Sequence, residues 1–174
     1  MEVISQKPLR LCLITANSFN MEISISGTDL VALIDDEDFE LVNKYKWKLQ
    51  DGKIKYARSS NRLGILMHRL LLRLKKGDPD VDHINGNGLD NRKHNLRLAN
   101  KSQNGANRTK QEESTSKYKG VSFNRRDCIW QVQIIYNQKH LCIGTFKTEL
   151  EGAIAYNKKA LELFGEFAKL NEIP

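Results

Sequence analysis

The stretch VDHINGNGLDNRKHNLRLANKSQNGANR, residues 81–108, decides the fold of the middle of this chain. Residues 81–84 predict a short strand, a turn-rich loop of Asn and Gly follows, and residues 95–99 predict a second short strand. Ser102 is expected to cap a short helix that runs to about Arg108. Strand, loop, strand and helix together predict a ββα unit.

Within this unit, Asp82 stands directly before His83, so a carboxylate lies next to a group that titrates near neutral pH. Metal-assisted hydrolysis of a phosphodiester bond requires at least a metal ligand and a general base, and this pair can supply both. The metal neutralises charge that develops on the phosphate, while an imidazole takes a proton from the attacking water. Oxygen ligands suit a hard ion such as Mg²⁺. Asp-His pairs are common, however, so the pair alone assigns no function.

The pattern D-H-x-N-G-N-x-x-D-N-R-x-x-N-L-R, followed after six further residues by Asn104, resembles the HNH endonucleases. The similarity covers residues 68–107 and is greatest to the phage homing-type branch, in which the last His is replaced by Asn. This resemblance implies that His83 is the general base and that Asp82 and Asn104 hold one divalent ion, Mg²⁺ or Mn²⁺. It also implies that Asn95 fixes the loop and orients the histidine, and that the substrate is double-stranded DNA.

Several of these residues also have a structural interpretation. Asn95 and Asn104 can serve as caps, and the Asn and Gly residues of 85–91 are ordinary turn formers. Arg92 and Arg97 are candidates for gripping phosphates, and a solvated surface position explains each of them equally well. The sequence leaves both interpretations open.

Residues 117–174 have a different pattern. The runs YKGVSF, WQVQIIY and HLCIGTF alternate and predict three strands, and a helix that stops near Gly165 follows. The apolar face expected for this helix consists of Ala153, Ile154, Tyr156, Ala160, Leu161 and Phe164. The exposed face of the strands is expected to display Lys119, Arg125, Arg126, Trp130 and Lys139. A sheet of this width can enter the major groove of DNA.

The sequence of this region resembles the DNA-binding domain of plant APETALA and ethylene-response transcription factors. The motifs that carry the resemblance are Y-K-G-V, then I-G-T-F-x-T, G-A-x-A-Y-N-x-x-A, F-G and L-N. The resemblance implies DNA contacts at Lys119, Arg125, Arg126, Trp130, Gln133 and residues 140–143. Ser122 and Cys142 depart from the arginine and tryptophan that this family usually has, so the plant recognition sequence is not carried over. The alternative for Trp130 is a core aromatic.

Residues 21–60 predict short strands in EISIS, LVALI and two runs around an Asp-Gly turn at 51–52. Between them, DDEDFELVNKY predicts a helix that carries Phe39, Leu41 and Val42 toward a core. Residues 65–74, ILMHRLLLRL, predict an amphipathic helix.

The expected fold class is therefore α+β: a ββα-metal nuclease unit with small N-terminal strands, followed by a three-stranded antiparallel sheet packed on one helix. The predicted organisation is a strand-rich region at 1–60, the ββα unit at 61–108, a polar linker at 109–116 and the three-stranded unit at 117–174.

Charge and composition agree with a polyanion as the binding partner. The net charge is +7, and residues 1–60 carry 8 basic and 9 acidic side chains, so the whole positive excess follows residue 60. Cys12, Cys128 and Cys142 form no CxxC pair, which argues against a disulfide framework and a thiolate zinc site. The run LRLCLITA at 9–16 is too short to span a bilayer. We therefore expect a cytoplasmic protein with no targeting signal, and no feature indicates a protein partner.

The leading hypothesis is a site-directed DNA endonuclease that is positioned by its last region. The rival is a non-cleaving, DNA-binding transcriptional regulator in which the ββα unit is only a scaffold. The joint presence of Asp82, His83, Asn95 and Asn104 disfavours the rival. An RNA-directed nuclease is disfavoured because A-form RNA hides the groove that a sheet would read.

Overall fold

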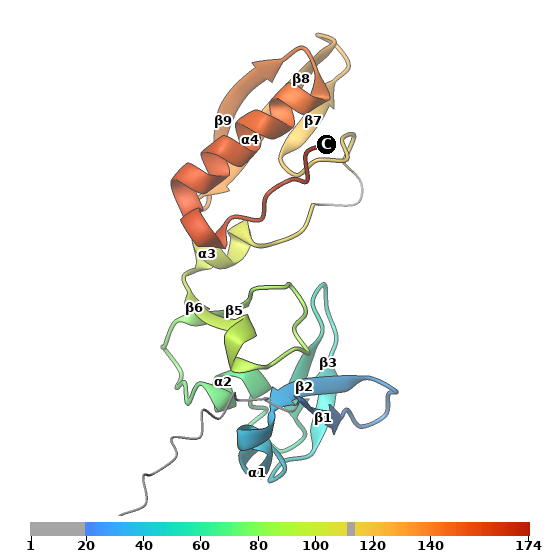
Figure 1. Ribbon diagram of the computed structural model, residues 1–174, viewed down its shortest axis with the longest axis vertical. Helices are drawn as coiled ribbons and strands as arrows, with labels where there is room; N and C mark the ends of the chain where they lie inside the picture. Colours follow the sequence, from blue (N-terminus) through green and yellow to red (C-terminus); the bar gives the residue numbers. More distant parts are fainter. Residues whose placement is uncertain (1–19, 111–113) are drawn as a thin grey trace, which may run out of the picture.

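A computed structural model describes residues 20–110 and 114–174 of the chain. The expectations for residues 1–19, including the apolar run at 9–16 and Cys12, lie outside the described residues, as do residues 111–113 of the predicted linker. The described chain forms two parts that follow one another along the longest axis, with helix α3 between them (Figure 1). The predicted α+β class is confirmed, since every sheet is small and antiparallel and is accompanied by helices.

The first part, residues 20–99, contains three two-stranded sheets. Strand β1 pairs with β2, β3 with β4, and β5 with β6. The bounds are β1 Asn20–Ser24, β2 Val31–Asp35, η1 Asp36–Asp38, α1 Phe39–Val42, β3 Trp47–Gln50, β4 Tyr56–Ser59, α2 Met67–Leu71, β5 Asp80–His83, η2 Lys93–Asn95 and β6 Leu96–Ala99.

One hydrophobic core joins the N-terminal strands to later segments of the first part. The buried side chains of β2, α1 and β3 pack with Met67 and Leu71 of α2 and with Leu89 from the loop after β5. Phe39 and Leu41 pack against this core beside the buried Val42, as their pattern predicted. This core contains residues on both sides of residue 60. The division of the chain into residues 1–60 and 61–108 remains a prediction.

The predicted ββα unit is present as β5, β6 and α3, with α3 spanning Lys101–Ala106. Its helix begins differently from the expectation. Asn100, and not Ser102, is the N-cap: the Asn100 side chain accepts from the backbone N–H groups of Ser102 and Gln103. The Asn100 N–H in turn donates to Oε1 of Gln103, which completes a capping box. Asparagine and serine are equally good caps, so residue type alone did not select the position.

The second part is a three-stranded antiparallel sheet, in the order β7-β8-β9, with one helix packed on it. The bounds are β7 Val121–Asn124, β8 Ile129–Tyr136, β9 Lys139–Phe146, α4 Glu149–Phe164 and η3 Gly165–Phe167. Thr148 and Glu151 form a capping box at the start of α4, and Gly165 follows its last residue as predicted. Ala106 of α3 is buried in the same core, so the helix of the ββα unit also belongs to the packing of the second part.

Gly120, just before β7, has a positive φ of 75°. A Cβ atom at this position would lie 2.2 Å from the ring of Tyr156 and 2.7 Å from the carbonyl oxygen of Gln133. The chain therefore needs glycine here to let β7 approach both α4 and β8.

Three local predictions differ from the structure. The helix expected at 65–74 ends at Leu71, because Arg73 adopts a left-handed conformation with φ 54° and stops it. The turn between β3 and β4 spans 51–55 and not two residues, since Gln50 pairs with Tyr56.

The apolar face predicted for α4 is also narrower than expected. Ala153, Tyr156, Ala160 and Phe164 are buried at helical spacing, whereas Ile154 and Leu161 are about half exposed, at 51% and 50%. Each of the two follows a buried alanine, and one residue corresponds to about 100° around a helix, so both lie at the edge of the buried stripe.

Within the described residues, no helix has the length and apolar character needed to cross a membrane. Cys128 and Cys142 are both exposed, unpaired thiols.

Candidate active site

The loop between β5 and β6 is closed by the side chain of Asn95. Its Oδ1 accepts a hydrogen bond of 3.0 Å from the backbone N–H of Asn85, and its Nδ2 donates to the carbonyl of Asp90 at 2.7 Å. The Nδ2 group also donates to Oδ1 of Asn85 at 3.1 Å. Asn95 is buried, with 3% of its surface exposed, so one amide ties the beginning of the loop to its middle.

The same loop contains a bidentate ion pair. Nε and Nη2 of Arg92 each donate to a different oxygen of the buried Asp90 at 2.7 Å, and Asn85 donates to Asp90 at 2.8 Å. These hydrogen bonds, first that of Arg92, lower the pKa of the Asp90 carboxyl. Arg92, a candidate for gripping phosphate, is thus already engaged in holding the loop.

The N-terminal strands fix the loop from the other side. Leu33 of β2 donates its N–H to Leu89 and accepts from the N–H of Asn91, both at 2.8 Å. Asp35 at the end of β2 accepts from the backbone N–H of Lys93 at 2.8 Å. Gly88 lies so close to β4 that a Cβ atom would be 2.4 Å from the carbonyl of Lys55. Residues 20–60 therefore support the loop, which is a role that the sequence alone did not reveal.

This support sets the orientation of His83, the last residue of β5. Asn91 is fully buried, and its Nδ2 donates to the carbonyl of Leu89 at 3.1 Å, so its Oδ1 is the atom that faces His83. Nε2 of His83 lies 3.4 Å from that oxygen. An oxygen acceptor at this position favours the tautomer with a proton on Nε2. No described residue forms a hydrogen bond with the other ring nitrogen, Nδ1, which then carries the lone pair.

Two more rings surround the imidazole of His83. The ring centroids of His68 and Tyr56 lie 5.1 Å and 5.7 Å from that of His83, and His68 meets it edge to face. Burial lowers the pKa of His83 below its usual 6.5, against the opposing effects of the Asn91 hydrogen bond and of Asp82 and Asp90. His83 is therefore neutral, and available as a base, at pH 7.

Asp82, whose side chain is almost fully buried, accepts hydrogen bonds from two residues. Nε and Nη2 of Arg97 lie 2.9 Å and 2.8 Å from Oδ2, and Nδ2 of Asn107 lies 3.0 Å from Oδ1. The same Asn107 nitrogen donates to the carbonyl of His83 at 2.8 Å. Asn104 lies one turn earlier on α3, and among the described residues its side chain has no hydrogen bond to Asp82 or His83. The amide that contacts both residues in this structure is thus that of Asn107.

Arg97 also reaches the second part of the chain. Its Nη1 donates to the carbonyl of Glu166 at 2.8 Å, and its guanidinium carbon lies 4.0 Å from the ring centre of Phe167. This side chain, a candidate phosphate contact, therefore connects Asp82 to the η3 helix that follows α4.

The residues around Asp82 carry the oxygen ligands that a hard divalent ion prefers. Asp82 offers carboxylate oxygens, and Asn104 and Asn107 carry amide oxygens at the end of α3. Among the described residues, Oδ1 of Asp82 accepts only from Asn107, and a carboxylate oxygen has two lone pairs, so this oxygen can also bind an ion. Across residues 20–110 and 114–174, no three His, Cys, Asp or Glu side chains cluster closely enough to hold a metal. A metal would therefore depend on amide oxygens and on the substrate for its remaining ligands.

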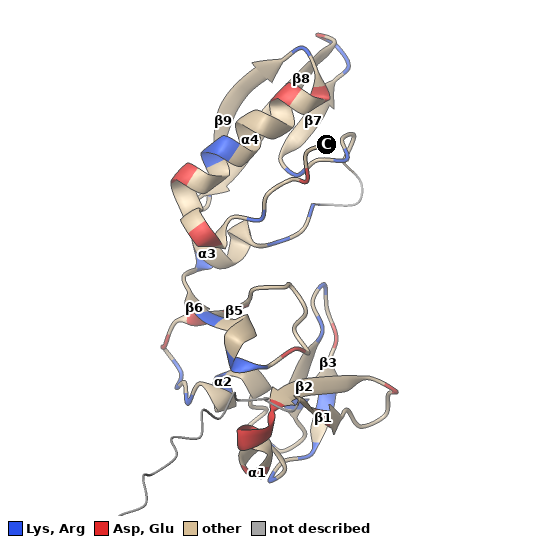
Figure 2. Cartoon of the chain, in the orientation of Figure 1, with Lys and Arg blue, Asp and Glu red and all other residues tan. Residues whose placement is uncertain are grey.

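The structure separates the DNA-contact candidates of the second part. Arg125 and Arg126 are exposed in the turn between β7 and β8, and Lys139 is exposed at the opposite end of the sheet. Gln133 is exposed on the sheet face away from α4, opposite Cys142 of β9. Figure 2 shows that charged residues on this part lie mostly at strand ends, in loops and on α4.

Trp130 and Lys119 do not lie on the exposed face where the sequence placed them. Trp130 packs against the hydrophobic core of the second part, with its ring centroid 4.9 Å from that of Phe123. This position agrees with the alternative interpretation as a core aromatic. Lys119 precedes β7 and donates its ammonium to the carbonyl of Ala106 in α3.

Two asparagines at the site were not singled out by sequence reasoning. In the sequence, Asn91, which faces the imidazole, is one of several turn formers, and Asn107, which contacts Asp82, is only the end of the resemblance. Asparagine is frequent in turns and helix caps, so their type carried no signal, and only the folded positions distinguish them.

Two comparisons with known proteins cover the ββα unit. The model of a family described as HNH endonuclease matches residues 66–106, which contain α2, β5, the loop, β6 and α3. A protein of Acanthamoeba polyphaga mimivirus named as an uncharacterized HNH endonuclease is 34% identical over 152 residues, which cover 84% of this chain and 78% of the viral protein. No solved structure matches the chain. From the shared length and the ββα unit at its centre, the chain belongs to the HNH endonuclease family.

Proposed function

We propose that this protein is a metal-dependent endonuclease of double-stranded DNA, in which His83 activates the attacking water. The observation that carries this proposal is the arrangement around His83: a buried, neutral imidazole, held through Nε2 by a fixed asparagine, beside a buried carboxylate. A regulator that only binds DNA has no need of either group at the end of a buried strand.

In the proposed reaction, Nδ1 of His83 takes a proton from water as the water oxygen attacks the scissile phosphorus. The bond from phosphorus to the 3′ oxygen breaks and this oxygen takes a proton from solvent water, so the products have 5′-phosphate and 3′-hydroxyl ends. Asn91 holds the imidazole in the required tautomer, and Asn95 keeps the loop that carries Asn91 closed. A positioned general base of this kind contributes about 10²- to 10⁴-fold to a rate.

The proposed metal ligands are Asp82 and Asn104, with Asn107 as the residue that aligns Asp82. A divalent ion bound there would supply charge neutralisation at the phosphate and at the leaving oxygen. Mg²⁺ or Mn²⁺ suits these oxygen donors.

The proposed role of the second part is to position the DNA. Its three-stranded sheet on one helix has the layout expected from the resemblance to APETALA and ethylene-response domains, and Arg125, Arg126, Gln133 and Lys139 are exposed at its face and ends. Phosphate contacts by such side chains orient a protein on the duplex, and contacts to base edges select the sequence.

The test is the conversion of supercoiled plasmid to nicked circles by the full chain in Mg²⁺, Mn²⁺ or EDTA. We expect nicking in either metal, none in EDTA, and a loss of at least 100-fold in His83→Ala. His94→Ala is the matched control, because His94 is an exposed histidine on η2 in the same loop, and it should keep the wild-type rate.

Three outcomes would contradict the proposal. Nicking that persists in EDTA would exclude a metal-dependent reaction. Equal nicking rates for His83→Ala and wild type would exclude His83 as the general base. A protein that binds the plasmid without nicking it in any metal would be the non-cleaving regulator.

A further inference from the structure

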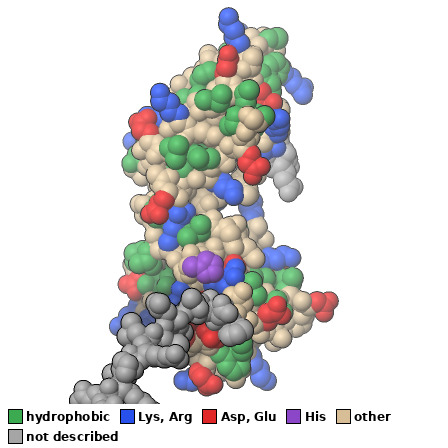
Figure 3. All heavy atoms as spheres, viewed as in Figure 1, with side chains coloured by type: hydrophobic (Ala, Val, Ile, Leu, Met, Phe, Trp, Pro, Cys, Tyr) green, Lys and Arg blue, Asp and Glu red, His purple; other side chains and the backbone are tan. Residues whose placement is uncertain are grey.

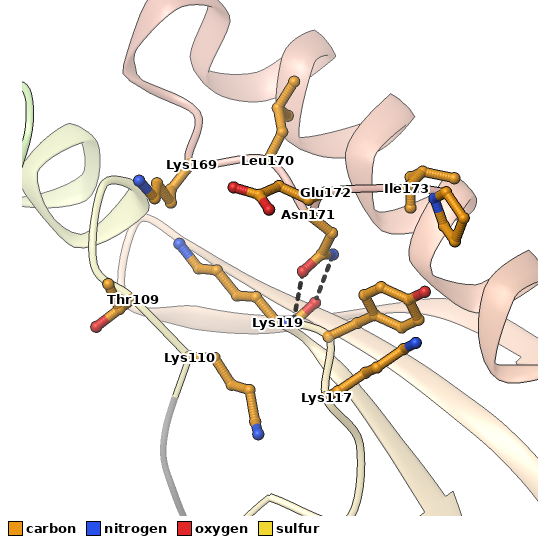
Figure 4. A pocket seen from close by; sticks show the side chains of 11 residues that line it. Thr109, Lys110, Lys117, Lys119, Lys169, Leu170, Asn171, Glu172 and Ile173 are labelled. Carbon is orange, nitrogen blue, oxygen red and sulfur yellow. Dashed lines mark hydrogen bonds between the residues drawn. The ribbon is translucent and has the colours of Figure 1, made fainter.

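A pocket of about 590 Å³ lies where three segments of the chain meet: the stretch after α3, the residues before β7, and the C-terminal tail. Of the residues that the structure describes, four lysines line it, namely Lys110, Lys117, Lys119 and Lys169, and Glu172 is the acidic one. Figure 4 shows the side chains of Lys119 and Lys169 converging on one side of this pocket. Basic residues occur on each of the three segments in Figure 2.

The pocket is fixed by hydrogen bonds. Asn171 in the tail pairs with the backbone of Lys119, accepting from its N–H at 2.6 Å and donating to its carbonyl at 3.1 Å (Figure 4). The backbone of Asn171 is held in turn by the side chain of Asn157 on α4, at 2.8 Å and 2.9 Å. These contacts set the backbone of the tail against the segment before β7, so the lysines are brought together by the fold.

The surroundings of Lys119 disfavour its charged form. Burial, followed by the charges of Lys169 and Arg108, lowers the pKa of Lys119 to about 8. No described acidic side chain forms a salt bridge with any of the four lysines. Figure 4 shows the Glu172 carboxylate on the same side as Lys119 and Lys169, whereas Lys110 and Lys117 extend along other parts of the lining. Among the described lining residues, four lysines against one glutamate leave an excess of positive charge on a concave surface, which favours an anion.

The pocket lies close to the candidate active site along the chain. Asn107, which donates to Asp82, is followed three residues later by Lys110. Three residues span at most ~11 Å. One strand of B-DNA rises about 3.4 Å per nucleotide, so this distance corresponds to roughly three nucleotides. Figure 3 shows that the surface is hollowed between the two parts of the molecule, where a strand could pass from one to the other.

We propose that the pocket lined by Lys110, Lys117, Lys119 and Lys169 binds a backbone phosphate of the DNA, within about three nucleotides of the bond that is cut. This inference rests on the proposed endonuclease function and adds a binding site that lies off the exposed sheet face. The site would bind the DNA strand next to the segment that leads from α3 into the second part. Because it contacts a phosphate, this binding would not depend on the base sequence.

The first test is a binding titration of the full chain carrying His83→Ala, so that the DNA stays intact. The probe is a fluorescein-labelled duplex of arbitrary sequence, about 30 base pairs or three helical turns long. The variant is Lys110→Ala, Lys117→Ala and Lys169→Ala together; Lys119 is left unchanged because its ammonium caps the carbonyl of Ala106. The control removes the same charge from the first part, through Lys44→Ala, Lys46→Ala and Lys53→Ala, all exposed.

We expect weaker binding by the pocket variant and a salt dependence, log K against log salt concentration, that is less steep by about 0.9 for each phosphate that the variant no longer neutralises. The control variant should keep the wild-type slope. Equal slopes for the pocket variant and the control variant would overturn the inference.

The second test locates the phosphate site by lysine acetylation and mass spectrometry. Duplex DNA should protect Lys110, Lys117 and Lys169 and leave Lys44 reactive. Inorganic phosphate is the comparison ligand: equal protection by phosphate would identify a site for a free anion, and no protection by either would exclude an anion site. Both readouts are independent of cleavage, so they decide the inference even if wild-type protein nicks no plasmid.

Discussion

The guanidinium of Arg97 donates a hydrogen bond from Nε to Oδ2 of Asp82 at 2.9 Å and forms an ion pair with the same oxygen through Nη2 at 2.8 Å, while Nη1 donates to the carbonyl of Glu166. One side chain thus connects the proposed metal ligand with η3, the short helix that follows α4. The Asp82 side chain is almost fully buried, with 4% of its surface exposed, so this ion pair lies away from solvent.

Arg97→Ala should therefore destabilise the protein. Removing one member of a buried ion pair leaves an uncompensated charge, which costs about 3 kcal/mol. Urea unfolding followed by circular dichroism measures this loss. Arg126→Ala, which removes an arginine side chain that is 93% exposed, should change the free energy of unfolding by less than about 0.5 kcal/mol. If both substitutions changed the free energy of unfolding equally, the ion pair of Arg97 with Asp82 would not stabilise the protein.

Asn107 and Asn104 should have separable roles. Asn107→Ala removes donors to Asp82 and to the carbonyl of His83, so we expect the metal-free protein to lose about 1 to 3 kcal/mol of stability. Asn104→Ala should leave that stability near the wild-type value and weaken the binding of Mn²⁺, measured by calorimetry. Unchanged Mn²⁺ affinity in Asn104→Ala would remove this residue from the proposed ligand set.

Asn91 is a positioning residue, and the pH profile of cleavage reveals its effect. Asn91→Asp would place a negative charge where the amide oxygen faces His83, and this charge raises the pKa of the imidazole. The acidic limb of the pH–rate profile should then move to higher pH, with little change in KM. A uniformly lower rate with the same acidic limb would indicate only a structural role.

His68 should make the protein sensitive to mild acid. Burial lowers its pKa to about 3, whereas the unfolded chain takes up a proton near 6.5. The unfolded state therefore binds more protons below pH 6.5, and this group lowers the free energy of unfolding by about 1.4 kcal/mol per pH unit as the pH falls from there toward 3.

The measurement is the slope of unfolding free energy between pH 6.5 and about 5, above the range in which carboxylates titrate. His68→Phe should flatten the slope by about one proton, because it keeps the ring and removes the unpartnered Nδ1. His94→Phe, at an exposed position, is the control. The same slope in His68→Phe and wild type would contradict the assignment.

The sequence predicted what is local. Asp82, His83 and Asn95 lie within one short pattern whose strand, turn and strand are recognisable, and the second part shows three alternating runs before a helix. It could not show that Leu33 in β2 hydrogen-bonds the loop on both sides of Asp90, since that pairing joins residues more than fifty positions apart. The expectation that Trp130 lies on the exposed face was wrong, because side chains alternate along a strand and Trp130 shares the face of the buried Val132 and Ile134.

The most direct measurement is the rate of plasmid nicking, with enzyme in excess over DNA, as a function of pH from about 5 to 8.5. We expect the wild-type rate to rise through an ionisation below 6.5 and then to level off, because burial lowers the pKa of the proposed base. In His83→Ala this ionisation should be absent and the residual rate low. If His83→Ala kept the wild-type rate and the same pH profile, His83 would not be the base.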